Sequence, residues 1–357
     1  MNSEQRIPAL DGMRGLAILC VLSVHLYAPA STKLMHVVKA GWVGVDLFFA
    51  LSGFLITGIL LRMRQQPDYY RRFYVRRAQR IFPVYYLALT VGLVVLPTTA
   101  GVLRLRELQA WYWTYTANVA QGIYGDEGMP AHWSLFWSLA VEEQFYLIWP
   151  LVVRRASLQT LSRVCVAGSL AVWVLRPVIF WSGGATAFVY SQLFTRADEL
   201  LLGALVAILA FEGRQLSPGC SRLTLAAGLV GLIGIGAWQG DLNVSPVVLS
   251  LGLPCVALVC FGTLGLCVNG RAPFLETSLL TFWAPYAYGL YVWHRIVTDA
   301  VTWPALGGHL GTFVLFSAKV AVSLVAAAAS WHLFERRWLR SSQPAPPQAP
   351  PARLSMG

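Results

Sequence analysis

The sequence predicts an all-α integral membrane protein, a polytopic bundle of about ten transmembrane helices. Composition is the first observation behind this fold class. Hydrophobic residues make up 57% of the 357-residue chain, charged residues only 12%, and the mean hydropathy is +0.58. Soluble domains carry about 25% charged residues. The second observation is a succession of long apolar runs, and the third is the gathering of basic residues in alternate loops between them.

The predicted helices are about as long as the hydrocarbon core of a bilayer requires. They occupy residues 8–28, 41–61, 81–98, 134–153, 160–181, 194–211, 222–239, 246–268, 284–303 and 312–333. Eighteen of the 27 Lys and Arg residues lie on one side of this arrangement, and four lie on the other. Because basic residues concentrate in cytoplasmic loops, the N- and C-termini are both predicted to be cytoplasmic. The net charge of +11 has this origin, so it indicates no nucleic-acid partner.

Residues 1–340 are predicted to form a single transmembrane domain, followed by a Pro/Ala-rich cytoplasmic tail, 341–357, that should be disordered. The loop 99–133 contains an aromatic stretch at 111–116 that is too polar and short for a clean span. An interfacial or re-entrant segment is the favoured interpretation, and stacking on a sugar is the alternative.

The first predicted helix carries Arg14 and His25, which are costly to place inside a bilayer. Eleven residues at 100° each come to about 20° past three turns, so both side chains project from one face, roughly 16 Å apart along the axis. A packing role, with Arg14 paired to Asp11, is one interpretation. In the other, His25 is a general base, because imidazole titrates near neutrality, and Arg14 stabilises an anionic group in the same cavity.

A cluster of arginines precedes the third predicted helix: Arg72, Arg76, Arg77 and Arg80. Arg72, Arg76 and Arg80 are spaced four residues apart and should form a ridge at the cytoplasmic mouth of the helix. Membrane topology alone explains basic residues at this place. The functional alternative is that they bind a phosphorylated ligand, since guanidinium groups match phosphate oxygens.

Two adjacent carboxylates, Glu142 and Glu143, lie halfway along the fourth predicted helix. Neighbouring side chains point about 100° apart, so at least one of the two should face a polar cavity. Pairing with an arginine such as Arg14 and a catalytic role both remain open. The same choice between ion-pair scaffolding and function applies to other polar residues within predicted spans: Asp46, Arg196, Asp198 and His294.

Together these residues predict a polar interior with a histidine toward one side and arginines toward the other. Proton-coupled transport fits that pattern, and so does a transfer reaction across the bilayer. The sequence contains no G-x-S-x-G elbow, P-loop, HExxH or cysteine–histidine signature. No metal site is expected.

The order and spacing of several motifs resemble the membrane acyltransferase-3 family, which includes bacterial O-antigen and exopolysaccharide acetylases and macrolide O-acyltransferases. The N-terminal motifs are Leu10-Asp11-Gly12-Met13-Arg14-Gly15, with Arg14 and His25 in an R-x10-H spacing, Gly44-Val45-Asp46-Leu47-Phe48-Phe49 and Ser52-Gly53-Phe54-Leu55-Ile56. The remaining motifs are Arg76-Arg77-Ala78-Gln79-Arg80-Ile81-Phe82-Pro83, Trp133-Ser134-Leu135, Glu142-Glu143-Gln144-Phe145-Tyr146, Arg196-Ala197-Asp198-Glu199-Leu200 and Tyr291-Val292-Trp293-His294.

The resemblance implies a membrane enzyme that transfers an acyl group, usually acetyl, from acyl-CoA to a hydroxyl of a carbohydrate or glycosylated acceptor. Surface polysaccharide, a lipid-linked sugar and a macrolide-type product all remain open as acceptors. The R-x10-H pair is essential in the family, so Arg14 and His25 are expected to be catalytic. Glu142 and Glu143 are further catalytic candidates, which would orient a histidine or pair with Arg14. The residues expected to bind the CoA phosphates are Arg72, Arg76, Arg77 and Arg80. The candidate substrate-binding residues are Asp46, Trp133, Ser134 and His294.

With no evident Ser or Cys nucleophile, direct attack by the acceptor is favoured, and an acyl-histidine intermediate stays open. The expected location is a bacterial-type cytoplasmic (inner) membrane. Family members that modify surface polysaccharides often add an SGNH hydrolase-like domain, whereas the tail here is short, which leaves the acceptor and its side of the membrane open. The alternative function is a transporter or flippase for a sugar-containing or anionic substrate, which would move substrate without consuming a thioester.

Overall fold

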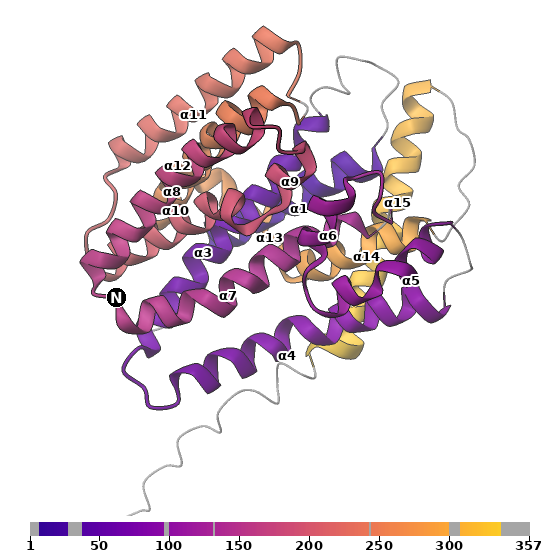
Figure 1. Cartoon of the computed structure of the whole chain (residues 1–357), viewed down its shortest axis with the longest axis horizontal. Helices are drawn as coiled ribbons and strands as arrows, with labels where there is room; N and C mark the ends of the chain where they lie inside the picture. Colours follow the sequence, from indigo (N-terminus) through magenta and orange to yellow (C-terminus); the bar gives the residue numbers. More distant parts are fainter. Residues whose placement is uncertain are drawn as a thin grey trace, which may run out of the picture.

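The computed structural model describes residues 7–27, 38–95, 100–130, 133–242, 244–299 and 308–336, and in these ranges the chain forms helices and no strands (Figure 1). The predicted all-α class is therefore confirmed. The tail predicted to be disordered, 341–357, lies outside the described residues.

A helix lies at each position where a span was predicted. These helices are α1 (Pro8–Leu26), α3 (Val43–Met63), α4 (Tyr69–Thr90), α7 (Trp137–Arg155), α8 (Leu158–Trp181), α10 (Leu193–Phe211), α11 (Pro218–Gln239), α12 (Leu253–Val268), α14 (Ala287–Asp299) and α15 (Gly308–Ser330). Six segments, those of α1, α3, α8, α11, α12 and α15, are long and apolar enough to cross a membrane. The other four, α4, α7, α10 and α14, carry more charge or are shorter.

Shorter elements connect these helices. They are η1 (Ala40–Trp42), η2 (Val91–Val95), α5 (Ala100–Trp113), α6 (Ala117–Tyr124), η3 (Ser134–Phe136), α9 (Thr186–Ser191), η4 (Val248–Gly252), η5 (Pro273–Glu276), α13 (Ser278–Thr281), η6 (Ala284–Tyr286) and η7 (Trp331–Glu335). The predicted loop 99–133 thus holds two helices, α5 and α6. At the end of α5, Tyr112 is buried, while Trp113 is 39% exposed and stacks on Tyr86 at 5.4 Å between ring centroids.

Helix α3 runs through the centre of the bundle between α1 and α10 (Figure 1). Glycines allow helices α3 and α1 to approach neighbouring backbone closely. A Cβ atom on Gly53 of α3 would lie 1.9 Å from the carbonyl oxygen of Leu200 on α10, and one on Gly12 of α1 would lie 1.5 Å from that of Leu275 in η5. Both distances are far inside van der Waals contact, so the two helix contacts require glycine.

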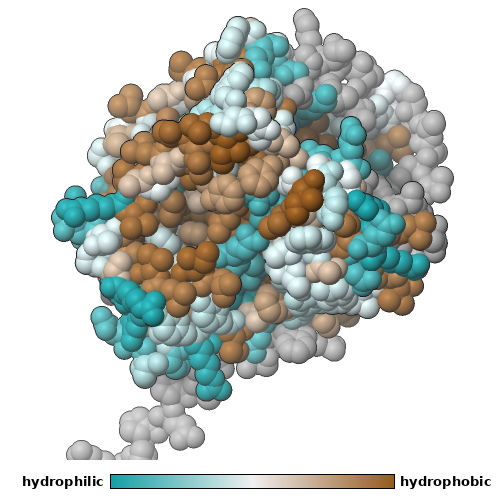
Figure 2. Space-filling view, viewed as in Figure 1, coloured by the Kyte–Doolittle hydropathy of each residue, from teal (hydrophilic) through white to brown (hydrophobic). Residues whose placement is uncertain are grey.

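Helices α8, α11 and α15 form much of the outer surface, and their exposed side chains are large and apolar. Figure 2 shows large hydrophobic areas on one face of the molecule, most of them on the side of α8 and α11, with hydrophilic groups between and around them. The exposed residues include Val174, Val178, Trp181, Leu223, Val230, Ile233, Leu310 and Val325. So many large apolar side chains on the outer surface indicate contact with lipid, since soluble proteins seldom expose them in large patches.

Candidate active site

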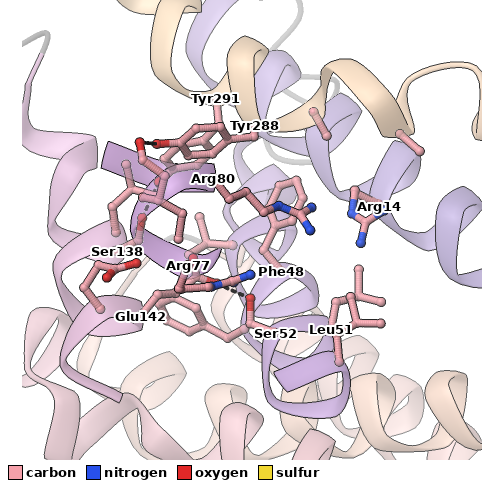
Figure 3. Close-up of a pocket in the computed structure, with 18 of the residues that line it drawn as sticks. Arg14, Phe48, Leu51, Ser52, Arg77, Arg80, Ser138, Glu142, Tyr288 and Tyr291 are labelled. Atoms are coloured by element: carbon pink, nitrogen blue, oxygen red, sulfur yellow. Dashed lines mark hydrogen bonds between the residues drawn. The ribbon is translucent and has the colours of Figure 1, made fainter. Parts of the chain in front are cut away.

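A cavity of about 440 Å³ opens among α1, α3, α4, α7 and the start of α14 (Figure 3). Its volume lies in the range of ligand-binding pockets, about 300–1,000 Å³. Charged and hydroxyl-bearing side chains line it among apolar ones. The polar lining residues are Asp11, Arg14, Ser52, Arg77, Arg80, Ser138, Glu142, Glu143, Tyr288 and Tyr291.

Three guanidinium groups reach this cavity from two helices. Arg14 comes from α1, and Arg77 and Arg80 come from α4 (Figure 3). Arg14 donates to Asp11 Oδ1 at 3.0 Å. The guanidinium of Arg77 lies 4.3 Å from the ring centroid of Tyr146, a cation–π contact that fixes its direction. The cavity therefore presents a concentrated positive charge suited to an anionic ligand.

Two carboxylates line the same cavity, as the sequence predicted for at least one of them. Glu142 accepts a hydrogen bond from the hydroxyl of Ser52 on α3. Glu143 interacts electrostatically with Arg77. Its Oε1 atom is buried without a hydrogen-bond partner in the described part of the structure. Adjacent carboxylates can both reach the cavity because it wraps around this side of α7.

His25 lies outside the residues that line the cavity, beyond Tyr291 and next to His294. The Nδ1 atom of His25 is 3.1 Å from Nε2 of His294, and the two rings stack at 5.1 Å between centroids. His294 is fully buried, and its Nδ1 atom lies 2.8 Å from the carbonyl oxygen of Leu290 and 3.0 Å from that of Tyr291. The histidine predicted as a substrate-binding residue is thus a direct neighbour of the predicted base.

Only part of the predicted arginine cluster lies at the cavity. Arg77 and Arg80, three residues apart, line it, whereas Arg72 and Arg76 do not. Arg72 donates to Asp68 at 3.1 Å and to Gln66 at 2.6 Å, and Arg76 is exposed. Arg80 belongs to the predicted ridge and reaches the cavity, whereas Arg77 reaches it from outside that four-residue spacing, so the spacing does not separate the cavity residues from the others.

The other predicted substrate-binding residues, Asp46, Trp133 and Ser134, lie outside the cavity lining. Asp46 is fully buried and forms an ion pair with Arg196 of α10. Trp133 is buried where Gly92 leaves space for its ring, and it stacks on Phe136 at 5.1 Å. Ser134 begins η3 and is not part of the cavity lining. This geometry favours the interpretation that Asp46 and Arg196 form an ion pair that supports the fold.

Four hydroxyl-bearing residues of the cavity were not predicted as site residues from the sequence: Ser52, Ser138, Tyr288 and Tyr291. The Tyr291 hydroxyl donates to the carbonyl of Leu135 at 2.9 Å and is also hydrogen-bonded to Ser138. The Tyr288 hydroxyl donates to the carbonyl of Ile81 at 2.7 Å. The sequence does contain a signal for the two tyrosines: Tyr288, Tyr291 and His294 follow one another at intervals of about one helical turn, so they share one face of the helix.

No group of three His, Cys, Asp or Glu side chains in the described part of the chain is arranged to hold a metal ion. The groups that the cavity itself supplies for chemistry are its carboxylates, hydroxyls and guanidinium groups.

Comparison with known proteins places the chain among acyl-transferring enzymes. A family model described as an acyltransferase domain matches residues 7–332. The chain is 31% identical to YrhL of Bacillus subtilis, which carries a provisional assignment as a peptidoglycan O-acetyltransferase, over 92% of this chain and 54% of that protein. It is 28% identical to the peptidoglycan O-acetyltransferase OatA of Listeria monocytogenes, over 93% of this chain and 56% of that protein.

A third relative is the O-acetyltransferase OatA of Staphylococcus aureus, at 26% identity over 94% of this chain and 57% of that protein. The chain thus spans about half the length of the curated relatives it matches. No solved structure matches the chain.

Proposed function

Because the chain belongs to the acyltransferase family whose model covers residues 7–332, we propose that it is a membrane O-acyltransferase that moves an acyl group, most simply acetyl, from acyl-CoA to a carbohydrate hydroxyl. The observation that carries the choice of donor is the convergence of Arg14, Arg77 and Arg80 on one cavity. Guanidinium groups bind phosphate oxygens by paired hydrogen bonds, and CoA is a polyphosphorylated thiol carrier.

In this proposal the cavity holds the phosphate-bearing part of the donor. Arg77 is directed by its contact with Tyr146, and Arg14 by its hydrogen bond to Asp11, so two of the three cations are pre-oriented. Arg72 and Arg76 lie outside the cavity, where exposed charge steers an anionic ligand toward the site without binding it directly.

His25 is the proposed general base. As the acceptor oxygen attacks the thioester carbonyl, its proton passes to the imidazole of His25, a C–O bond forms, and the C–S bond then breaks. The leaving thiolate of CoA takes up the proton. Arg14 lies roughly 16 Å from His25 along α1, which is too far for both to act on one carbonyl. We therefore assign Arg14 to the donor's phosphates and not to the oxyanion of the tetrahedral intermediate.

The distribution of basic residues supports an orientation in which ten helices cross the membrane and both termini are cytoplasmic. The arginine cavity then takes its donor from the cytoplasm, where acyl-CoA is made. His25 lies nearer the opposite side and would meet an acceptor there. The names of the relatives favour peptidoglycan, in a bacterial cytoplasmic membrane, as the acceptor class.

The test is thioester turnover by the purified protein in nanodiscs, with acetyl-CoA as donor and soluble peptidoglycan fragments as acceptor. Free CoA is measured with a thiol-reactive dye, and acetylated fragments by mass spectrometry. We expect both products from the wild type, and neither from His25→Ala. Arg14→Ala should weaken acetyl-CoA binding, whereas Arg76→Ala is the matched control that keeps it.

Unchanged transfer by a well-folded His25→Ala variant would refute the role of the base. Movement of a glycan or anion across the membrane without CoA release would instead support the transporter alternative. Acetyl-CoA binding, measured separately by calorimetry, distinguishes a missing acceptor from a wrong donor.

A further inference from the structure

His25 near the end of α1 and His294 in the middle of α14 have a hydrogen-bond pattern that fixes where their protons lie. Nδ1 of His294 faces two backbone carbonyl oxygens, at 2.8 and 3.0 Å, and carbonyl oxygens can only accept. Nδ1 of His294 must therefore carry a proton. In the neutral ring, Nε2 then bears the lone pair, and it accepts from Nδ1–H of His25 at 3.1 Å. The remaining nitrogen of His25, Nε2, is left with its lone pair.

We propose that His294 is a positioning residue that holds His25 in the tautomer protonated at Nδ1, so that Nε2 of His25 is the atom that accepts the acceptor's proton. This inference rests on the proposed function of His25 as a base. It assigns to His294 the part that a buried carboxylate plays in a serine-protease triad, in which the orienting group fixes the tautomer of the catalytic imidazole.

The burial of His294 is consistent with a neutral ring that orients His25. His294 is 0% exposed, whereas His25 is partly exposed. A positive charge on the fully buried His294 ring would be costly, because burying a charge away from water is unfavourable. A neutral ring orients His25 without adding charge to an apolar region.

The helix geometry makes His294 rigid. Its Nδ1 atom bonds back to the preceding turn of its own helix, through Leu290 and Tyr291, and its backbone carbonyl accepts from the hydroxyl of Thr298 at 2.6 Å. When His25 takes up a proton, its Nδ1–H bond to His294 is retained and becomes charge-assisted, which stabilises the imidazolium formed in the transition state.

The direct test is the protonation state of His25 in the resting protein, read by NMR of histidine labelled with ¹⁵N in nanodiscs. His25 signals are assigned by difference from His25→Asn. We expect a protonated Nδ1 and an unprotonated Nε2. A spectrum in which Nε2 of His25 carries the proton would overturn the proposal, because His294 would then be the donor of the pair. This readout requires no substrate and no variant of His294.

Two variants separate positioning from packing. His294→Gln supplies an amide oxygen that can accept from His25, whereas His294→Phe fills similar space and offers no acceptor. We expect His294→Gln to keep the His25 tautomer and much of the turnover. His294→Phe should mix the tautomers and lower kcat about a hundredfold at little-changed KM for acetyl-CoA, a loss at the lower end of what general-base catalysis supplies. His332→Phe, on η7, is the control.

The outcomes distinguish this inference from the proposed function. Absence of thioester turnover in the wild type would count against the function, while the spectrum still decides the tautomer. Turnover with an unchanged His25 tautomer and unchanged kcat in His294→Phe would refute the positioning role alone. If His294→Phe does not fold, the wild-type spectrum and His294→Gln carry the test.

Discussion

The buried ion pair between Asp46 and Arg196 gives the sharpest test of which polar residues support the fold and which contact substrate. Both side chains are fully buried, Asp46 on α3 and Arg196 on α10. The guanidinium of Arg196 also lies 4.8 Å from the ring centroid of Tyr190 and 5.5 Å from that of Trp137. Asp46→Asn removes the carboxylate that is hydrogen-bonded to this guanidinium and leaves it with the aromatic rings and the more weakly interacting Glu199 and Asp198.

The expected loss follows from the burial of the pair. Removing one partner of a buried ion pair costs about 3–5 kcal/mol, since it leaves an uncompensated charge away from water. Replacing both partners with apolar residues of similar size is often neutral or stabilising, by about 1–4 kcal/mol. Asp46→Asn should therefore lower the free energy of unfolding by about 3 kcal/mol or more, and Asp46→Leu combined with Arg196→Met should recover most of that loss.

The measurement is reversible unfolding in mixed micelles of a mild detergent and SDS, followed by circular dichroism. Acetyl-CoA binding is measured on each variant below its unfolding transition. If Asp46→Asn unfolds with the wild-type free energy and loses donor or acceptor binding, the ion-pair interpretation is wrong and Asp46 contacts substrate, as the sequence motif first suggested.

Three further changes probe the cavity and the packing around it. Arg77→Ala should raise the KM for acetyl-CoA about tenfold to a hundredfold, as expected for loss of charge-assisted hydrogen bonds, whereas steady-state kinetics of Arg72→Ala should show little change. Ser52→Ala and Glu142→Gln should each lower turnover, and the double variant should be no worse than the poorer single one, because the two side chains share a hydrogen bond; additive losses would contradict this. Gly12→Ala should destabilise the protein in a thermal melt, since its Cβ would lie 1.5 Å from the carbonyl oxygen of Leu275, while Gly234→Ala on α11, where nothing lies within 4 Å, should be tolerated.

Composition and periodicity were sufficient to predict the helical positions, because a membrane-embedded backbone must satisfy its hydrogen bonds within helices. They were less informative about the site. A ridge of arginines at four-residue spacing is explained equally well by topology or by binding, and only the packing of α4 against the bundle separates Arg77 and Arg80 from Arg72 and Arg76. Ser52 and Ser138 gave little signal, since hydroxyl groups are common in membrane helices and the partners of these two serines lie on other helices.

The pairing of His25 with His294 was the least accessible feature, since 269 residues separate the two side chains in sequence. Asp46 shows the same limit. The sequence left ion-pair scaffolding and contact with substrate both open for this carboxylate, and it could not reveal that α10 brings Arg196 against it. Which buried charges neutralise each other is decided by helix packing, and single-helix periodicity carries no information about it.

The arrangement divides the proposed reaction between two places on α1. Arg14 lies at the cavity, and His25 lies beyond Tyr291, whose ring lines the cavity on one side and approaches His294 at 6.3 Å on the other. A donor anchored by its phosphates must therefore extend its thioester arm past Tyr291 to react. Interactions at the arginines persist from the bound donor to the transition state, whereas proton transfer at His25 occurs only in the transition state. Loss of Arg14, Arg77 or Arg80 should consequently raise KM, and loss of His25 or His294 should lower kcat.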